Sequence, residues 1–126
     1  MSKTVVQTDA APGPVGGAPY SQGVVAGGML FTSGQVGFAP DGTLAGEIAA
    51  ETHRVFDNLT AILHAGGASL DRVVKTTVFM TDLGQFSAMN AVYAERMPQP
   101  FPARSTFQVA GLPGGALVEI EVVALV

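Results

Sequence analysis

The sequence predicts an α+β fold in which one mixed, six-stranded sheet carries two α-helices on a single face. Runs of alternating or β-branched residues predict the strands, and two stretches of apolar residues at helical spacing predict the helices. Glycine and proline clusters separate these elements. The predicted order is a strand, a two-strand hairpin, a helix, a strand, a helix and a second two-strand hairpin. Strands mixed with crossover helices are typical of one helical layer on one sheet.

The length and composition favour one small oligomeric domain. The chain has 126 residues, which suits a single domain spanning 1–126, and 48% of them are hydrophobic while only 13% are charged. A chain of this size has limited interior, so we expect part of the apolar surface to lie between subunits of a homo-oligomer. The net charge of -4 disfavours nucleic acid as a partner.

The sequence contains no cysteine, which excludes a disulfide scaffold, a thiol nucleophile and thiolate metal sites. The first residues lack the apolar core of a signal peptide, and no apolar run approaches the length that spans a membrane. We therefore expect a soluble cytoplasmic protein without a membrane partner.

The N-terminal part is predicted to hold three strands and a long loop. Residues 4–6 form a short strand, and 23–26 pairs with 29–33 across the two-residue turn Gly27-Gly28. Residues 9–19 are rich in proline and glycine, so this segment is either a flexible linker or an ordered loop laid over another part of the molecule. Tyr20 follows that loop and either contributes to a site or anchors the loop.

Two local features follow in the same region. Gly34, directly after Ser33, predicts a bulge or a close approach of another group to the backbone. Residues 48–64 show helical spacing of apolar side chains, and Gly66-Gly67 predicts a left-handed end to that helix. The two histidines of the chain fall on the polar face of this helix, which favours solvent contact over a metal site.

A strand over 71–80 and a second helix come next. Asp82 with Gln85 resembles a capping box at the start of that helix. Its inner face carries apolar side chains and one amide, Asn90, which must find hydrogen bonds or cost stability. Asn90 therefore either braces a loop or serves a site.

The last quarter of the chain concentrates the charged residues of interest. Two alternating runs, 101–109 and 117–122, are separated by turn residues and are predicted to pair as a hairpin. The register that joins their apolar rows places Arg104 and Thr106 on the same sheet face as Glu119 and Glu121. This arrangement is either a cross-strand salt bridge on the surface or the centre of a catalytic site.

Six short motifs, in order along the whole chain, resemble the reactive intermediate deaminase family (RidA, also called YjgF). They are Pro19-Tyr20-Ser21-Gln22, Thr32-Ser33-Gly34-Gln35, Val74-Lys75-Thr76-Thr77-Val78-Phe79, Asn90-Ala91-Val92-Tyr93, Phe101-Pro102-Ala103-Arg104-Ser105 and Val118-Glu119-Ile120-Glu121. The resemblance implies a chorismate-mutase-like fold that assembles as a trimer around a central barrel, with active clefts between subunits.

The resemblance also implies a site and a reaction. Arg104 grips a substrate carboxylate, and Glu119 orients or activates water; Tyr20, Ser33, Gly34, Asn90 and Thr106 line the site, and Phe86 adds an apolar wall. The implied reaction hydrolyses 2-imino acids, formed from enamines such as 2-aminoacrylate, to 2-keto acids and ammonia. It requires no metal and no organic cofactor.

Two other functions stay open at this stage. A non-catalytic sensor of small keto or amino acids would use the same arginine. A ribonuclease or translation inhibitor would need a basic groove with aromatic platforms, whereas this chain is acidic and has no tryptophan.

Overall fold

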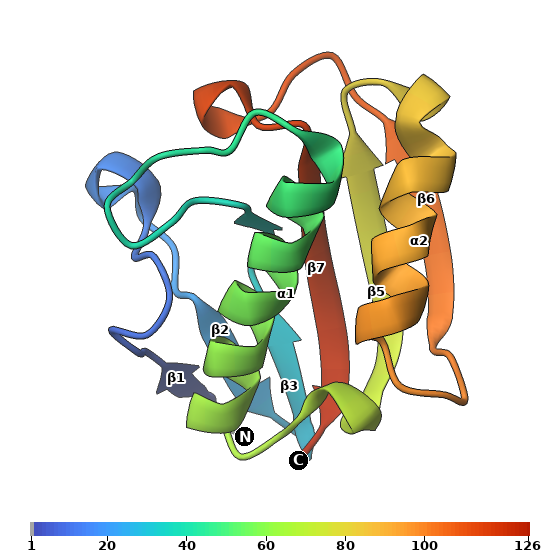
Figure 1. The fold of residues 1–126 in the computed structure, drawn as a ribbon. Coiled ribbons are helices and arrows are strands. Elements are labelled where there is room, and N and C mark those ends of the chain that lie inside the picture. Colours follow the sequence, from blue (N-terminus) through green and yellow to red (C-terminus); the bar gives the residue numbers. More distant parts are fainter. Residues whose placement is uncertain (1) are drawn as a thin grey trace.

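A computed structural model describes residues 2–126 and confirms the α+β fold with both helices on one face of a mixed sheet (Figure 1). The strands are β1 (Thr4–Val6), β2 (Gly23–Ala26), β3 (Met29–Thr32), β4 (Gln35–Val36), β5 (Val73–Met80), β6 (Ala103–Gln108) and β7 (Val118–Leu125). The helices are α1 (Ile48–Ala65) and α2 (Phe86–Arg96). The six expected strands are all present, and the two-residue strand β4 is a seventh that the sequence did not indicate.

The strand order in the sheet is β1-β2-β3-β7-β5-β6, and β4 also pairs with β7. The Gly27-Gly28 hairpin between β2 and β3 is confirmed, with both glycines at positive φ. Strand β7 runs antiparallel to β3, β4 and β5, whereas β6 runs parallel to β5. Helix α2 connects these two parallel strands, as the direction of a parallel pair requires.

The predicted hairpin between the last two strands is wrong. Strand β5 lies between β6 and β7, so residues 109–117 form a crossover that passes the end of β5 rather than a tight turn. Alternation along a strand shows that two faces differ, but it does not reveal which strand is the neighbour.

The predicted placement of Arg104 and Thr106 on one face with Glu119 and Glu121 is wrong as well. Residues that are paired across neighbouring strands point to the same face of a sheet. Thr76 on β5 is paired with Arg104 on β6 and with Val122 on β7, so all three point to the helical side. Glu119 pairs with Phe79, three residues further along β5 and therefore on the opposite side.

The core lies between the helices and the sheet. Helix α1 buries one face, and the apolar residues of that face with no exposed surface are Val55, Phe56, Leu59, Ile62 and Leu63. The helix begins where the Glu47 carboxylate accepts hydrogen bonds from the amides of Ala49 and Ala50. It ends before Gly67, whose φ of 84° supplies the predicted left-handed residue.

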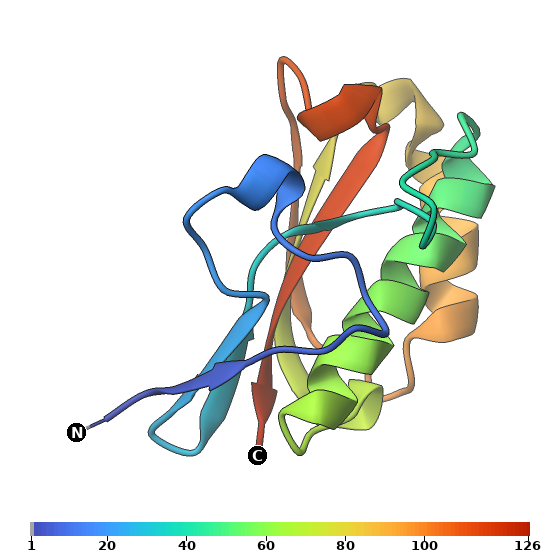
Figure 2. The same cartoon turned by 90° about the vertical axis from the view of Figure 1, so that its left-hand side faces the viewer.

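Among residues 2–126, no α-helix covers the opposite face of the sheet (Figure 2). Apolar side chains lie exposed there, among them Phe31 at 45% and Phe107 at 52% of their surface. Phe107 stacks on Phe79 with ring centroids 6.4 Å apart. We call this the open face. Neither helix has the length and apolar character needed to cross a bilayer, over residues 2–126.

Candidate functional site

The Arg104 side chain lies on the helical side of the sheet, at the edge strand β6, against helix α2. Its Nη1 donates a hydrogen bond of 2.8 Å to Oδ1 of Asn90. The guanidinium carbon lies 4.7 Å from the ring centroid of Tyr93 and 5.5 Å from that of Phe86. The unusual amide on the inner face of the second helix thus finds its partner in the arginine.

The Arg104 guanidinium has N–H donors that no residue in 2–126 uses. Within residues 2–126, no carboxylate lies in ion-pair range of Arg104, and Asn90 takes only one of its five N–H groups. Both residues line a cavity of about 300 Å³ with Tyr93, Ala94, Phe101 and Pro102. A cationic fork at an open cavity with an aromatic rim suits a small carboxylate that binds through two parallel hydrogen bonds.

Glu119 lies on the open face, in a second cavity of about 350 Å³ that Tyr20, Ser33 and Gly34 also line. Burial raises the pKa of the Glu119 carboxyl group, and the neighbouring Glu121 charge raises it further. No residue in 2–126 donates a hydrogen bond to this carboxylate. Glu119 is therefore available to exchange a proton with a bound molecule.

Gly34 is required by the position of the Glu119 carboxylate. A Cβ atom at position 34 would lie 2.1 Å from Oε1 of Glu119 and 2.7 Å from its Cδ. The close approach predicted for this glycine is real, and it is an approach to the candidate catalytic acid. The break in the ladder at Ser33-Gly34 also ends β3 at Thr32 and separates the short β4 from it.

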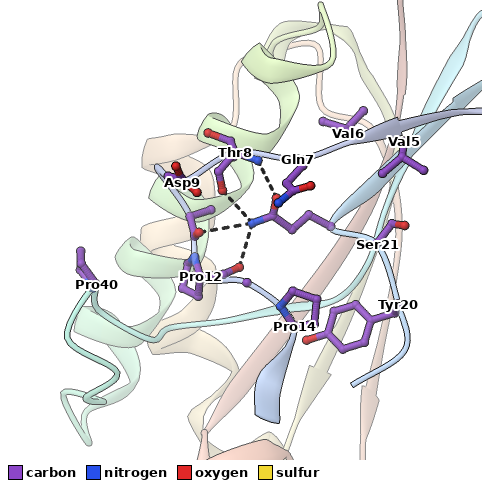
Figure 3. Close-up of a pocket in the computed structure, with 13 residues that line it drawn as sticks. Val5, Val6, Gln7, Thr8, Asp9, Pro12, Pro14, Tyr20, Ser21 and Pro40 are labelled. Carbon is purple, nitrogen blue, oxygen red and sulfur yellow. Dashed lines mark hydrogen bonds between the residues drawn. The ribbon is translucent and has the colours of Figure 1, made fainter. Parts of the chain in front are cut away.

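The proline- and glycine-rich segment is an ordered loop laid over the Glu119 cavity. The buried Gln22 side chain holds the start of this loop through four hydrogen bonds, which Figure 3 draws as dashed lines. Its Oε1 accepts a hydrogen bond from the amide of Thr8, and its Nε2 donates to the carbonyls of Thr8, Ala11 and Pro12. The Tyr20 hydroxyl accepts a hydrogen bond of 2.9 Å from the amide of Val15. Ser33 donates to the carbonyl of Ser21 at 2.6 Å.

A further cavity of about 440 Å³ lies under the same loop (Figure 3). Pro12, Gly13 and Tyr20 line both this cavity and the Glu119 cavity. The Tyr20 ring therefore forms part of the wall of both.

The predicted site residues thus form two groups in one chain. The arginine group comprises Phe86, Asn90 and Arg104, with Thr106 two residues along the same face of β6. The glutamate group comprises Tyr20, Ser33, Gly34 and Glu119. Strand β5 separates β6 from β7, so Arg104 and Glu119 lie on opposite faces of the sheet, two strand spacings (about 10 Å) apart across the strands and three residues apart along them.

The sequence reasoning missed two residues that line the arginine cavity. It put Tyr93 on the inner face of the second helix with Asn90, three residues away, but did not include it among the site residues. It treated Phe101 only as the start of a strand, whereas this ring lies at the cavity with about half of its surface exposed.

The part of the chain that the structure describes contains no group of three His, Cys, Asp or Glu side chains that could hold a metal ion. Nδ1 of His53, one of the two histidines, accepts a hydrogen bond of 3.1 Å from Nη1 of Arg96.

Comparison with known proteins yields a consistent set of relatives. The family model described as Endoribonuclease L-PSP matches residues 8–126. Reactive Intermediate Deaminase A, chloroplastic, from Arabidopsis thaliana is 44% identical over 126 residues, which cover 98% of this chain and 66% of that protein. The 2-iminobutanoate/2-iminopropanoate deaminase of Homo sapiens is 39% identical over 127 residues, covering 99% and 91%.

Solved structures agree with this result. The crystal structure of RidA from the Antarctic bacterium Psychrobacter sp. PAMC 21119 superposes with a TM-score of 0.92 at 43% identity, covering 98% of this chain and 99% of that one.

Proposed function

Because the chain belongs to the reactive intermediate deaminase (RidA) family, which the Endoribonuclease L-PSP model describes, we propose that it is a 2-iminobutanoate/2-iminopropanoate deaminase. Its substrates are 2-imino acids formed from reactive enamines such as 2-aminoacrylate, and its products are 2-keto acids and ammonia. The observation that carries this proposal is the Arg104 guanidinium, which faces an open cavity without a carboxylate partner among residues 2–126.

Arg104 binds the substrate carboxylate. Asn90 accepts a hydrogen bond from one N–H group and fixes the rotation of the guanidinium, which leaves a pair of parallel donors for the two carboxylate oxygens. Phe86 and Phe101 supply an apolar rim for the substrate side chain. Thr106 lies two residues from Arg104 on the same face of β6.

Glu119 acts as the general base for the attacking water. Its raised pKa makes it a better proton acceptor than an ordinary carboxylate, so it removes a proton as water attacks the imine carbon. Because the imine is protonated when water adds, the attack gives a neutral carbinolamine and a protonated Glu119. Glu119 returns this proton to the amino nitrogen, the C–N bond breaks and ammonia leaves, while the hydroxyl proton passes to the Glu119 carboxylate as the C=O bond forms. Ammonia then takes up that proton as ammonium, which restores the carboxylate. Tyr20, Ser33 and the backbone at Gly34 position the water and the substrate in this cavity.

The complete site forms between copies of the chain, which assemble as a homotrimer. Two observations support this proposal: the arginine and glutamate groups lie on opposite sheet faces of one chain, and the open face exposes aromatic side chains. A copy packed on the open face would bring its arginine group to the glutamate group of its neighbour.

The deciding experiment couples the protein to a pyridoxal-phosphate threonine dehydratase and follows the appearance of 2-oxobutanoate. Catalytic amounts of the protein should accelerate the release of keto acid, and Arg104→Ala should abolish the acceleration without changing the oligomeric state. Keto-acid kinetics that stay unchanged over a wide range of protein concentration would overturn the proposal.

The two alternatives predict different results in the same set of measurements. A sensor would bind 2-oxobutanoate through Arg104 but leave the dehydratase time course unchanged. A ribonuclease would degrade single-stranded RNA, and Arg104→Ala would retain that activity. The acidic charge of the chain is unfavourable for RNA binding.

A further inference from the structure

Tyr93 lies directly beneath Arg104, with its ring facing the guanidinium at 4.7 Å. The ring is only 5% exposed. It also meets the edge of Phe56, with centroids 5.6 Å apart and an interplanar angle of 79°. Tyr93 is thus fixed on one side by the core and presents its other side to the arginine.

The Tyr93 hydroxyl is fixed as well. It shares a hydrogen bond of 2.8 Å with the hydroxyl of Thr76, which has no exposed surface. Burial raises the pKa of Tyr93, so the phenol stays neutral and keeps this bond.

The position of Thr76 connects this bond to the arginine. Thr76 lies on β5 directly opposite Arg104 on the parallel strand β6. The hydrogen bond between the Tyr93 and Thr76 hydroxyls therefore links helix α2 to the residue of β5 that is paired with Arg104. This bond fixes the orientation of the Tyr93 ring next to the arginine.

We propose that Tyr93 is a positioning residue for carboxylate recognition, with its ring as the platform of Arg104 and its hydroxyl anchored by Thr76. The ring and Asn90, one helical turn apart on α2, together fix the guanidinium in two independent ways: the ring sets its plane and Asn90 sets its rotation. The remaining donors then point into the cavity in one orientation. This inference rests on the proposed deaminase function, which supplies the carboxylate.

The test separates the ring from the hydroxyl. Tyr93→Leu removes the ring, whereas Tyr93→Phe keeps it and removes only the anchor. The dissociation constant for 2-oxobutanoate is measured by titration calorimetry, and kcat and KM are measured with 2-iminobutanoate generated by the dehydratase. We expect Tyr93→Leu to raise both Kd and KM about 3- to 30-fold with little change in kcat, because the loss affects uniform binding. Tyr93→Phe should stay within about threefold of the wild type.

Ile62→Ala is the control for stability. Ile62 is fully buried on α1 and lies against Gly23 on β2, which is four strands away from β6 in the sheet. This variant should lower the melting temperature but leave Kd and KM unchanged. If Tyr93→Leu changes only the melting temperature and leaves Kd and KM within twofold, Tyr93 is a core residue and the proposal is overturned.

A measurement on the wild-type chain covers the case in which Tyr93→Leu does not fold. The Arg104 side-chain N–H resonances should appear upfield of those of Arg54 and Arg72, because the Tyr93 ring current acts on them. If the Arg104 resonances lie at the same chemical shifts as those of Arg54 and Arg72, the proposal that Arg104 stacks on the Tyr93 ring is overturned. A wild-type protein that neither binds 2-oxobutanoate nor hydrolyses the imine would instead overturn the proposed function itself.

Discussion

Replacement of Gly34 by alanine should remove most of the activity without unfolding the protein. The added Cβ would lie 2.1 Å from Oε1 of Glu119, and ordinary van der Waals contact begins at 3.4 Å. The carboxylate must therefore move by about 1.3 Å (3.4 Å minus 2.1 Å). Gly34 does not have a positive φ, so its backbone accepts alanine without strain, and the effect arises from the side-chain contact alone.

The expected losses of stability and of catalytic rate differ, because the fold tolerates a moved Glu119 side chain better than the reaction does. A flexible side chain rotates away at a cost of about 0.5–1.5 kcal/mol, so the melting temperature should fall by only a few degrees. A displacement of about 1 Å at a catalytic group lowers the rate by about 100-fold, and we expect a loss of this order in the dehydratase-coupled assay.

Gly111→Ala is the matched control, because a Cβ at Gly111 meets nothing within 4 Å and its φ is not positive. It should leave both activity and melting temperature unchanged. A folded Gly34→Ala variant with wild-type activity would refute the assignment of Glu119 as the group that serves the water.

Three further changes test separate parts of the structure. The Glu121 charge raises the pKa of Glu119, so Glu121→Gln should lower that pKa and move the acid limb of the rate profile to lower pH; a limb that stays in place or moves up would contradict this. Gln22→Ala removes the amide that holds the loop, so hydrogen exchange at the Thr8 amide should accelerate while exchange in the core helix stays slow. Glu51 is buried and accepts hydrogen bonds from two backbone amides, so Glu51→Leu should lower the free energy of unfolding in urea by about 2–4 kcal/mol, and Glu51→Gln by less.

The local elements were predictable because each has its own signal in the sequence. Helical spacing, the Gly27-Gly28 turn and the left-handed Gly67 each fix a short segment without reference to the rest of the chain. The six motifs also identified residues that line the two cavities, among them Gly34 and Arg104.

The pairing of the last strands was not predictable by the same means. The rule that an apolar row faces the core failed for β6, because Phe107 stacks on Phe79 at the open face while Arg104 points toward the helix. The helical side of this edge strand carries polar side chains, whereas Phe107 lies on the open face, so the more apolar face of β6 is not the one that faces the helices. The separation of Arg104 from Glu119 depends on that distinction, which only the three-dimensional structure reveals.

The location of Arg104 and Glu119 on opposite faces has a genetic consequence. On the proposed assembly, a chain that lacks the arginine still carries an intact acid, and a chain that lacks the acid still carries an intact arginine. Two such defective alleles, each inactive alone, would complement each other when co-expressed, because a hybrid particle would contain a cleft with both intact groups. A single-chain site would show no such rescue.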